Sequence, residues 1–383
     1  MQSNYIKLLS ERSLGVTVDL FIWVQWNMEQ TSSIGDTRED CLDKLVSILA
    51  PLAPRTRQLE LLSDVYSGSE LQPILASFIK LCTSSLLEVF TVRACHKPSQ
   101  NAELFNWSQL QSTDPPTTHQ IDTFIRPVRV LELRDAYIPW DSHLYRGLTE
   151  LFVHLSGSAH PISQDQLLQI LLVCPALKVL SFRNIYTSSS SEVPNELEPV
   201  HLNQLQRLEL ISSRPERLTC LLRAISAKSQ SLTVRLSLVG NDSEFVQQLH
   251  TFFDRHAAIT VLHVRPKVKT AWFSPLSNSL HRLSKLTLEA CDFADADLAM
   301  FVRTEHFNNG SVPWPWLYEL RLIDCIVDIE LLECLATSPF IEKIRLIHSK
   351  VREPDSGRFV PVKRSMFTPV YGGSHVVITI FND

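Results

Sequence analysis

The chain has 383 residues, of which 44% are hydrophobic and 20% are charged, a composition that excludes a disordered protein. Its formal net charge of -5 gives no excess of lysine and arginine, so nucleic acid is not an expected partner. One compact core is unusual at this length, which leaves either several domains or a structure that grows by repetition.

The N-terminal segment, 1–25, is predicted to form a cap and joining segment. Residues 5–12 are expected to form a short helix. A strand is expected next, because apolar residues alternate there: Val16, Val18, Leu20 and Ile22. The start lacks the features of a secretory signal, and none of the apolar runs approaches the roughly 20 residues that span a bilayer. A cytoplasmic or nuclear protein without a membrane partner is therefore expected.

Apolar residues recur along the chain with the spacing of a leucine-rich repeat. The clearest copies share one spacing: Leu87, Phe90, Val92, Cys95; Leu283, Leu286, Leu288, Cys291; and Leu317, Leu320, Leu322, Cys325. Weaker copies tile the chain between them: Leu59/Leu61, Val128/Leu131/Leu133, Leu148/Leu151/Val153, Leu177/Leu180/Phe182, Leu205/Leu208/Leu210, Leu236/Leu238, Ile259/Leu262/Val264 and Ile341/Ile344/Leu346. This periodicity predicts an α/β leucine-rich-repeat solenoid, an irregular horseshoe with one concave β-sheet and outer return helices.

Return helices are predicted where apolar residues at helical spacing lie between these strands. Examples are 167–172, which ends before Pro175, and 245–253. Pro339 is expected to stop a third helix. Three polar stretches are predicted as loops: 98–127, 188–199 and 304–315. The segment 376–381 is expected to form the last strand, within a C-terminal cap over 350–383, and the whole chain, 1–383, is expected to be one domain.

Catalytic and metal-binding motifs are not found in the sequence. It holds no glycine-rich phosphate loop, no nucleophile elbow and no His-Glu-x-x-His, so no enzyme activity, cofactor or metal is expected. The eight cysteines form no Cys-x-x-Cys pair and are expected to be reduced and buried. Asp292, Asp295 and Asp297 form the densest acidic cluster, which is interpreted as a helix N-cap rather than a calcium loop.

Two further features leave alternatives open. Trp314-Pro-Trp316 is either an exposed interface hot spot or core packing, because Trp316 directly precedes the repeat residue Leu317. The mildly basic region 343–364 either steers an acidic partner or is a solvated edge.

The residues that alternate with the inward leucines are predicted to form a partner-binding face, because side chains alternate along a strand. The candidates are Arg93, Glu132, Arg134, Glu150, His154, Arg183, Arg207, Glu209, His263, Arg265, Lys285, Glu289, Glu319, Arg321, Lys343 and Arg345. Both signs of charge are mixed on this face, which favours a protein partner over a uniform polyanion.

Two stretches resemble the fungal family of F-box proteins with leucine-rich repeats. Ile6-Lys-Leu-Leu-Ser-Glu-Arg-Ser, followed by Val16-Thr-Val-Asp-Leu, looks like the helix and first strand that join the F-box to the repeats. Cys174-Pro-Ala-Leu-Lys-Val-Leu is similar to the start of a repeat in that family. The resemblance implies a substrate receptor, in which the F-box engages a Skp-type adaptor of a cullin ubiquitin ligase and the repeats hold the target. The F-box would precede Tyr5, so we expect either a truncated sequence or a repeat-only binder.

Three functions therefore stand as hypotheses. The leading one is a non-catalytic recognition module, the substrate-recognition part of an F-box-type ubiquitin ligase receptor. The alternative is a stand-alone leucine-rich-repeat scaffold or inhibitor that masks a partner protein without any link to ubiquitin. The third is an enzyme with a site in the long loops, around His119 or His306.

Overall fold

The computed structural model divides the chain into two compact units, here called unit 1, Met1–Val193, and unit 2, Pro194–Asp383. That the whole chain is one domain stays a prediction. The structure describes residues 6–10, 17–24, 45, 48–50, 52–63, 71–82, 86–94, 105–106, 115–156, 162–185, 187–188, 198–212, 215–238, 243–266, 279–293, 314, 316–328, 332, 341–352, 359–361 and 377–381.

Unit 1 is a largely parallel sheet whose strands are joined through helices. Its main strands, in spatial order, are β1 (Ile6–Ser10), β2 (Val18–Val24), β3 (Thr56–Ser63), β4 (Val89–Ala94), β6 (Val130–Arg134), β8 (Glu150–His154) and β10 (Val179–Arg183). Only β1 runs antiparallel to its neighbour among these described strands. The helical segments are η2 (Ala53–Arg55), α2 (Leu71–Leu81), α3 (Thr118–Ile125), η5 (His143–Tyr145) and α4 (Gln164–Leu172), and the short strands are β5 (Phe105–Asn106), β7 (Ala136–Tyr137), β9 (Ile162–Ser163) and β11 (Thr187–Ser188).

Unit 2 is also built on a parallel sheet, with described helices between its first three main strands. Its main strands, in spatial order, are β13 (Arg207–Ile211), β15 (Leu232–Leu238), β16 (Ile259–Pro266), β17 (Lys285–Glu289), β18 (Glu319–Ile323), β20 (Lys343–Ile347) and β23 (Val377–Phe381). All of them run parallel to their neighbours. Among the described residues of unit 2, the helices are α5 (Pro215–Ala224) and α6 (Ser243–Arg255), and the short strands are β12 (Val200–His201), β14 (Ile225–Ser226), β19 (Ile326–Asp328), β21 (Lys350–Arg352) and β22 (Phe359–Pro361).

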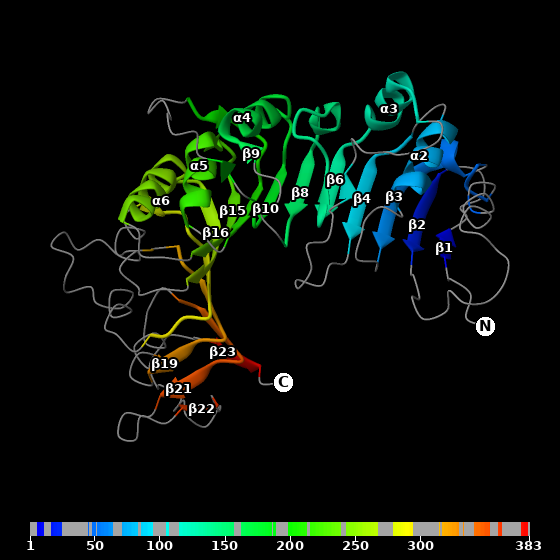
Figure 1. The fold of residues 1–383 in the computed structure, drawn as a ribbon. Coiled ribbons are helices and arrows are strands. Elements are labelled where there is room, and N and C mark those ends of the chain that lie inside the picture. The colour runs from blue at the N-terminus through cyan, green and yellow to red at the C-terminus, as the bar shows by residue number, and fades with distance from the viewer. Residues whose placement is uncertain are drawn as a thin grey trace. The chain divides into compact units, whose positions relative to one another are not determined.

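The helices of each unit lie on one face of its sheet. Each new parallel strand is added at the same edge, and crossover connections are almost always right-handed, so successive connections return over the same face. Figure 1 shows α2, α3 and α4 along one side of the unit 1 strands. The leucine-rich side chains of the strands are buried: Leu131, Leu151 and Leu180 are 0% exposed in unit 1, as are Leu208, Leu262 and Leu320 in unit 2. Every weaker repeat copy predicted from the sequence lies in a main strand or in the few residues directly before it. Helices α4 and α6 are confirmed where the periodicity predicts them.

One residue after many of the strands adopts the left-handed conformation, at the same point of the repeat. These residues are Asp135, Asn184, Ala290, Asp324 and His348, with φ between 50° and 57°. The N–H of Asp324 donates to the carbonyl of Ile347 at 2.9 Å, and that of His348 donates to Phe381 at 3.0 Å, each reaching the end of the next strand. Asp, Asn and His tolerate this conformation better than most residues. The repeated turn redirects the chain into a second row of short strands, such as β19 and β21.

A second repeated contact joins the end of a helix to the preceding turn, 29 residues earlier in the chain. The thiol of Cys82 donates to the carbonyl of Ala53, and that of Cys174 donates to Tyr145. In unit 2 the same spacing links the N–H of Ala227 to Nε2 of His256 at 2.9 Å. Both units therefore satisfy a buried backbone group with a small polar side chain at the helix end.

Two expectations from the sequence are wrong. Residues 5–12 are not a helix, because Ile6–Ser10 is β1 and pairs antiparallel with β2. The stretch 98–127 is not wholly a loop, since α3 occupies Thr118–Ile125 behind a capping box of Thr117 and Gln120. The predicted last strand is confirmed as β23. Among the described residues no helix is both long and apolar enough to cross a membrane.

Candidate functional site

The polar face of each sheet is defined here by the strand residues that alternate with the buried leucines. On β18, Glu319 and Arg321 alternate with Leu320 and Leu322, which are 0% exposed. Neighbouring parallel strands lie about 4.8 Å apart, so side chains in register on this face come within reach of each other. All sixteen residues predicted for the partner-binding face occupy such positions. That they bind a partner stays a prediction.

Glu319 is the centre of the first charged cluster of unit 2. Its carboxylate accepts from Arg321 at 2.7 Å and forms ion pairs with Arg345 at 2.9 Å and Lys285 at 3.2 Å. The side chain of Glu319 is only 3% exposed, so its charge depends on these three cations. Burial alone would raise the pKa of Glu319, but the hydrogen bonds from Arg321 and Lys285 outweigh it and hold the pKa below its usual value.

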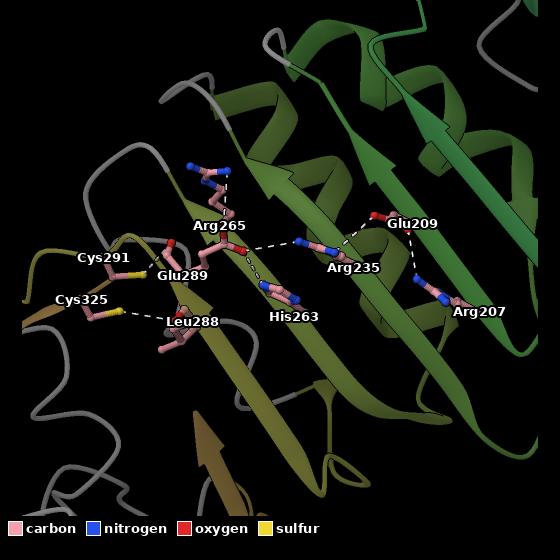
Figure 2. A network of polar contacts seen from close by, with 9 residues as sticks. All are labelled: Arg207, Glu209, Arg235, His263, Arg265, Leu288, Glu289, Cys291 and Cys325. Carbon is pink, nitrogen blue, oxygen red and sulfur yellow. Dashed lines mark hydrogen bonds and ion pairs between the residues drawn. The ribbon is translucent and has the colours of Figure 1, made fainter. Parts of the chain in front are cut away.

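Glu289 is the centre of the second cluster, which Figure 2 shows from close by. The carboxylate lies 2.8 Å from Nε2 of His263, 3.4 Å from Arg265 and 3.6 Å from Arg235. Burial and the neighbouring Arg235 lower the pKa of His263, and the hydrogen bond with Glu289 offsets only part of that shift. His263 is therefore mainly neutral at pH 7, and the two arginines carry the positive charge of the cluster.

Arg235 links the second cluster to a third. One guanidinium nitrogen lies 3.6 Å from Glu289 and the other lies 3.6 Å from Glu209, whose second cation is Arg207 at 3.3 Å. Glu209 and Glu319 are buried, at 1% and 2% exposure, although the sequence predicts them as part of an outward-facing surface. Arginines from the same strand and from the next one pair with each of these carboxylates. The exposed part of this face consists mainly of cations.

Unit 1 carries a smaller network on its polar face. Arg93 bridges Glu60 at 2.9 Å and Glu132 at 3.2 Å, and Arg134 donates to Glu132 at 2.5 Å. His154 hydrogen-bonds Ser181 at 3.0 Å. The structure therefore brings Arg93, Glu132 and Arg134 together, as it brings the unit 2 residues together, and leaves Glu150 outside these ion pairs.

Sequence reasoning misses two members of these networks, Arg235 and Glu60. Arg235 lies between the buried residues Val234 and Leu236 on β15. The sequence interpretation takes Leu236 and Leu238 as the repeat landmarks, so Arg235 falls outside the predicted face. The same alternation would have predicted both residues. Arg235 lies between Val234 and Leu236 on β15, and Glu60 lies between Leu59 and Leu61 on β3.

The described cysteines are free and mostly buried, as the sequence predicts. Burial raises the pKa of Cys82 to about 12 and that of Cys220 to about 11. A hydrogen bond with Cys325 and burial together raise the pKa of Cys291 far above its usual value. Cys291 and Cys325 follow the left-handed residues Ala290 and Asp324, so they share one repeat position. Cys95 lies outside the described residues. The raised pKa values make the thiols of Cys82, Cys220 and Cys291 poor nucleophiles near neutral pH.

The acidic cluster and the two histidines singled out in the sequence form no recognisable site among the described residues. Within the described part of the chain, no three His, Cys, Asp or Glu side chains gather as a metal-ligand set. Asp292 forms an ion pair with Arg352 at 3.0 Å, which places one residue of the basic region 343–364 against it. Asp295, Asp297, His306 and the predicted helix stop Pro339 lie outside the described residues. His119 is an exposed residue of α3.

The two tryptophans of the Trp-Pro-Trp segment differ in exposure. Trp314 is 6% exposed and belongs to the core, whereas Trp316 is 69% exposed. Core packing therefore explains Trp314 alone. The exposed ring of Trp316 remains a candidate interface residue, since tryptophan is enriched at binding hot spots.

Comparison with known proteins adds no functional assignment, because neither a protein-family model nor a curated protein matches this sequence.

Proposed function

We propose that this chain is a leucine-rich-repeat solenoid that binds another protein through the polar faces of its sheet and carries no catalytic site. The observation that carries the proposal is the register of charged side chains on those faces. The buried leucines supply the core, and exposed cations such as Arg207 and Arg265 add little to stability because water screens them. Residues that the core does not require, arranged in register across parallel strands, suit recognition of a partner.

The solenoid assignment is supported by features that recur at fixed points of the chain. The left-handed residue after the strand, the hydrogen bond to the next strand end and the 29-residue contact at helix ends each appear more than once. A structure built by repetition stacks equivalent groups in this way. We further propose the horseshoe form, with the polar faces on its concave side.

More specifically, we propose that the chain is the substrate-recognition part of an F-box-type ubiquitin ligase receptor and works in the cytoplasm or nucleus. It rests on the resemblance of 16–20 and 174–180 to the fungal F-box family, because the stretch compared with the joining helix of that family contains strand β1. In that arrangement the polar faces would hold the target, and a Skp-type adaptor and cullin would join through an F-box. A chain that binds a target but never an adaptor would instead be a scaffold or inhibitor.

The test is co-purification of the tagged full chain from its own cells, with mass spectrometry of the proteins retained. One variant neutralises the polar face of unit 2 with Arg207→Gln, Arg265→Gln and Lys343→Gln. A charge-matched control neutralises three exposed cations outside the sheets: Arg126→Gln, Lys178→Gln and Lys228→Gln. A third variant changes the polar face of unit 1 through Phe152→Ala and His154→Ala, two β8 residues that alternate with the buried Leu151 and Val153.

We expect at least one partner that the control retains and a polar-face variant loses. Equal retention by all three variants would overturn the proposed function. Recovery of a Skp-type adaptor with the wild-type chain would support the ligase proposal, and its absence beside a retained target would leave the scaffold alternative.

A further inference from the structure

We propose that the polar face of unit 2 binds an acidic peptide segment of its partner, one that also carries an apolar residue. This inference deepens the proposed function and rests on it.

The charge balance on this face carries the argument. Strands β13, β15, β16, β17, β18 and β20 hold seven lysine and arginine residues and three glutamates, so four positive charges are in excess. The cations are Arg207, Arg235, Arg265, Lys285, Arg321, Lys343 and Arg345. The whole chain has a formal net charge of -5, so this excess is local to one face. A local excess of one sign attracts a ligand of the other sign.

The excess cations are also the accessible ones. The side chains of Arg207 and Arg265 are 50% and 52% exposed, whereas those of Glu209 and Glu319 are 2% and 3% exposed. Lys343 is half-buried, and it forms no ion pair with another described residue. A ligand approaching this face therefore meets guanidinium and ammonium groups before it meets carboxylates.

Two exposed aromatic residues directly precede β18, the fifth of the six strands of this face. Trp316 is 69% exposed and Tyr318 is 46% exposed, and both precede the first residue of β18. The hydroxyl of Tyr318 lies 3.4 Å from the carboxylate of Glu319, which ties the tyrosine to the first charged cluster. The backbone of Tyr318 accepts a hydrogen bond from Lys343. Trp and Tyr beside Arg form the residue set that is enriched at binding hot spots, and they offer a contact for an apolar side chain.

The width of the face sets the length of the ligand. Six parallel strands with a spacing of about 4.8 Å span roughly 24 Å. An extended peptide covers about 3.4 Å per residue, so roughly seven residues reach across the face. A peptide of ten residues is therefore long enough to meet cations from both ends of the strip.

The mixed composition favours a peptide over a nucleic acid. The three glutamates neutralise three of the seven cations, so the face offers four excess positive charges, fewer than a continuous phosphate backbone would engage. The side chains of an acidic peptide are spaced and flexible, so they can pair with the exposed arginines and avoid the glutamates.

The test is fluorescence anisotropy of a labelled ten-residue peptide of alternating Glu and Asp with one central Leu, titrated with the full chain. A peptide with Lys at every acidic position is the charge control. We expect the acidic peptide alone to bind, with affinity falling at least tenfold between 50 and 500 mM salt, because screening shortens the Debye length. The unit 2 variant Arg207→Gln, Arg265→Gln and Lys343→Gln should weaken binding roughly tenfold, since each exposed pair contributes a factor of a few.

The matched control removes the same number of charges from unit 1 through Arg57→Gln, Arg134→Gln and Arg183→Gln, and it should leave the affinity within about twofold. A second pair of variants, Lys343→Gln and Trp316→Ala, leaves every described ion pair intact and guards against misfolding of the triple variant. Each should weaken binding by a few-fold.

Three results would overturn the proposal: no binding of the acidic peptide, equal losses in the unit 1 and unit 2 triple variants, or tighter binding of a single-stranded oligonucleotide with the same number of charges. The proposed function fails separately, because it fails only when no polar-face variant loses a partner in cells. If the unit 1 variant loses a partner and the acidic peptide does not bind unit 2, the acidic-peptide proposal fails and the proposed protein-binding function stands.

Discussion

The polar faces of units 1 and 2 differ in their balance of charge. In unit 1, strands β2, β3, β4, β6, β8 and β10 hold four arginines and four acidic residues, so their charges balance. The six corresponding strands of unit 2 hold seven cations and three glutamates. Both units have the same alternation of buried leucines and polar residues. The charge of the polar positions can therefore differ between units while the buried positions stay leucine-rich. Recognition can be adjusted at the exposed polar positions, such as Arg207 and Arg265, with little effect on the core.

The largest effect is expected from removing the central carboxylate of unit 2. Glu319→Gln leaves Lys285, Arg321 and Arg345 close together without their shared anion, and we expect unit 2 to lose about 3 kcal/mol of its free energy of unfolding. The matched change in unit 1, Glu132→Gln, should cost about 1 kcal/mol, because its side chain is 16% exposed and water screens its arginines.

Hydrogen exchange with mass spectrometry reads both units in one sample, through peptides from β18 and β6. Equal destabilisation by Glu132→Gln and Glu319→Gln would contradict the claim that the buried carboxylate of unit 2 contributes more to stability.

A pH effect of about 2 kcal/mol is expected in unit 2 at His256. Its Nδ1 contacts the carbonyl of Phe252 and its Nε2 accepts from Ala227, so the fold suits the neutral ring with the proton on Nδ1. Burial lowers the pKa of His256 from 6.5 to about 4. Its stabilisation is therefore complete above pH 6.5 and is lost as the pH falls toward 4, which gives about 2 kcal/mol between pH 7 and pH 5.

The corresponding residue of unit 1 is Cys174, whose pKa burial raises, so its thiol does not titrate in this range. Exchange rates measured at both values of pH, corrected for the intrinsic rate, should show the loss in α6 and not in α4. His256→Gln should remove the pH dependence, and its persistence in that variant would assign the effect to another group.

The smallest effect concerns the left-handed residue after the strand. Unit 1 has Asn184 at this point and unit 2 has Ala290, both with positive φ. Asn tolerates this conformation and Ala pays a steric cost, so Ala290→Asn should stabilise unit 2 by about 1 kcal/mol and Asn184→Ala should destabilise unit 1 by a similar amount. Thermal melts of the two variants check the signs, and two changes of the same sign would contradict the repeat equivalence of these positions.

The sequence predicts the strands well, because the leucine spacing alone determines which face each strand buries. It fails at β1, where the short apolar segment 6–10 fits a helix or a strand and pairing with β2 decides between them. It also misses α3, although Thr117, Gln120, Ile121 and Phe124 give a capping box and a helical apolar spacing.

The charged face is predicted residue by residue but not as a network. Which cations meet Glu289 depends on strand order, register and side-chain rotamers, and none of these follows from the spacing of leucines. The charge difference between the units becomes visible only when the polar face is counted strand by strand, since the net charge of the whole chain hides it.

Site-specific photo-crosslinking of the full chain in its own cells tests the central claim most directly. A photoreactive residue would replace Arg265 on the polar face of unit 2 or, as the control, Lys178, an exposed residue outside the strands. We predict a discrete covalent adduct with the same partner protein from position 265 and none from position 178. An adduct formed from position 178 and not from position 265 would contradict the claim that the polar face is the binding surface.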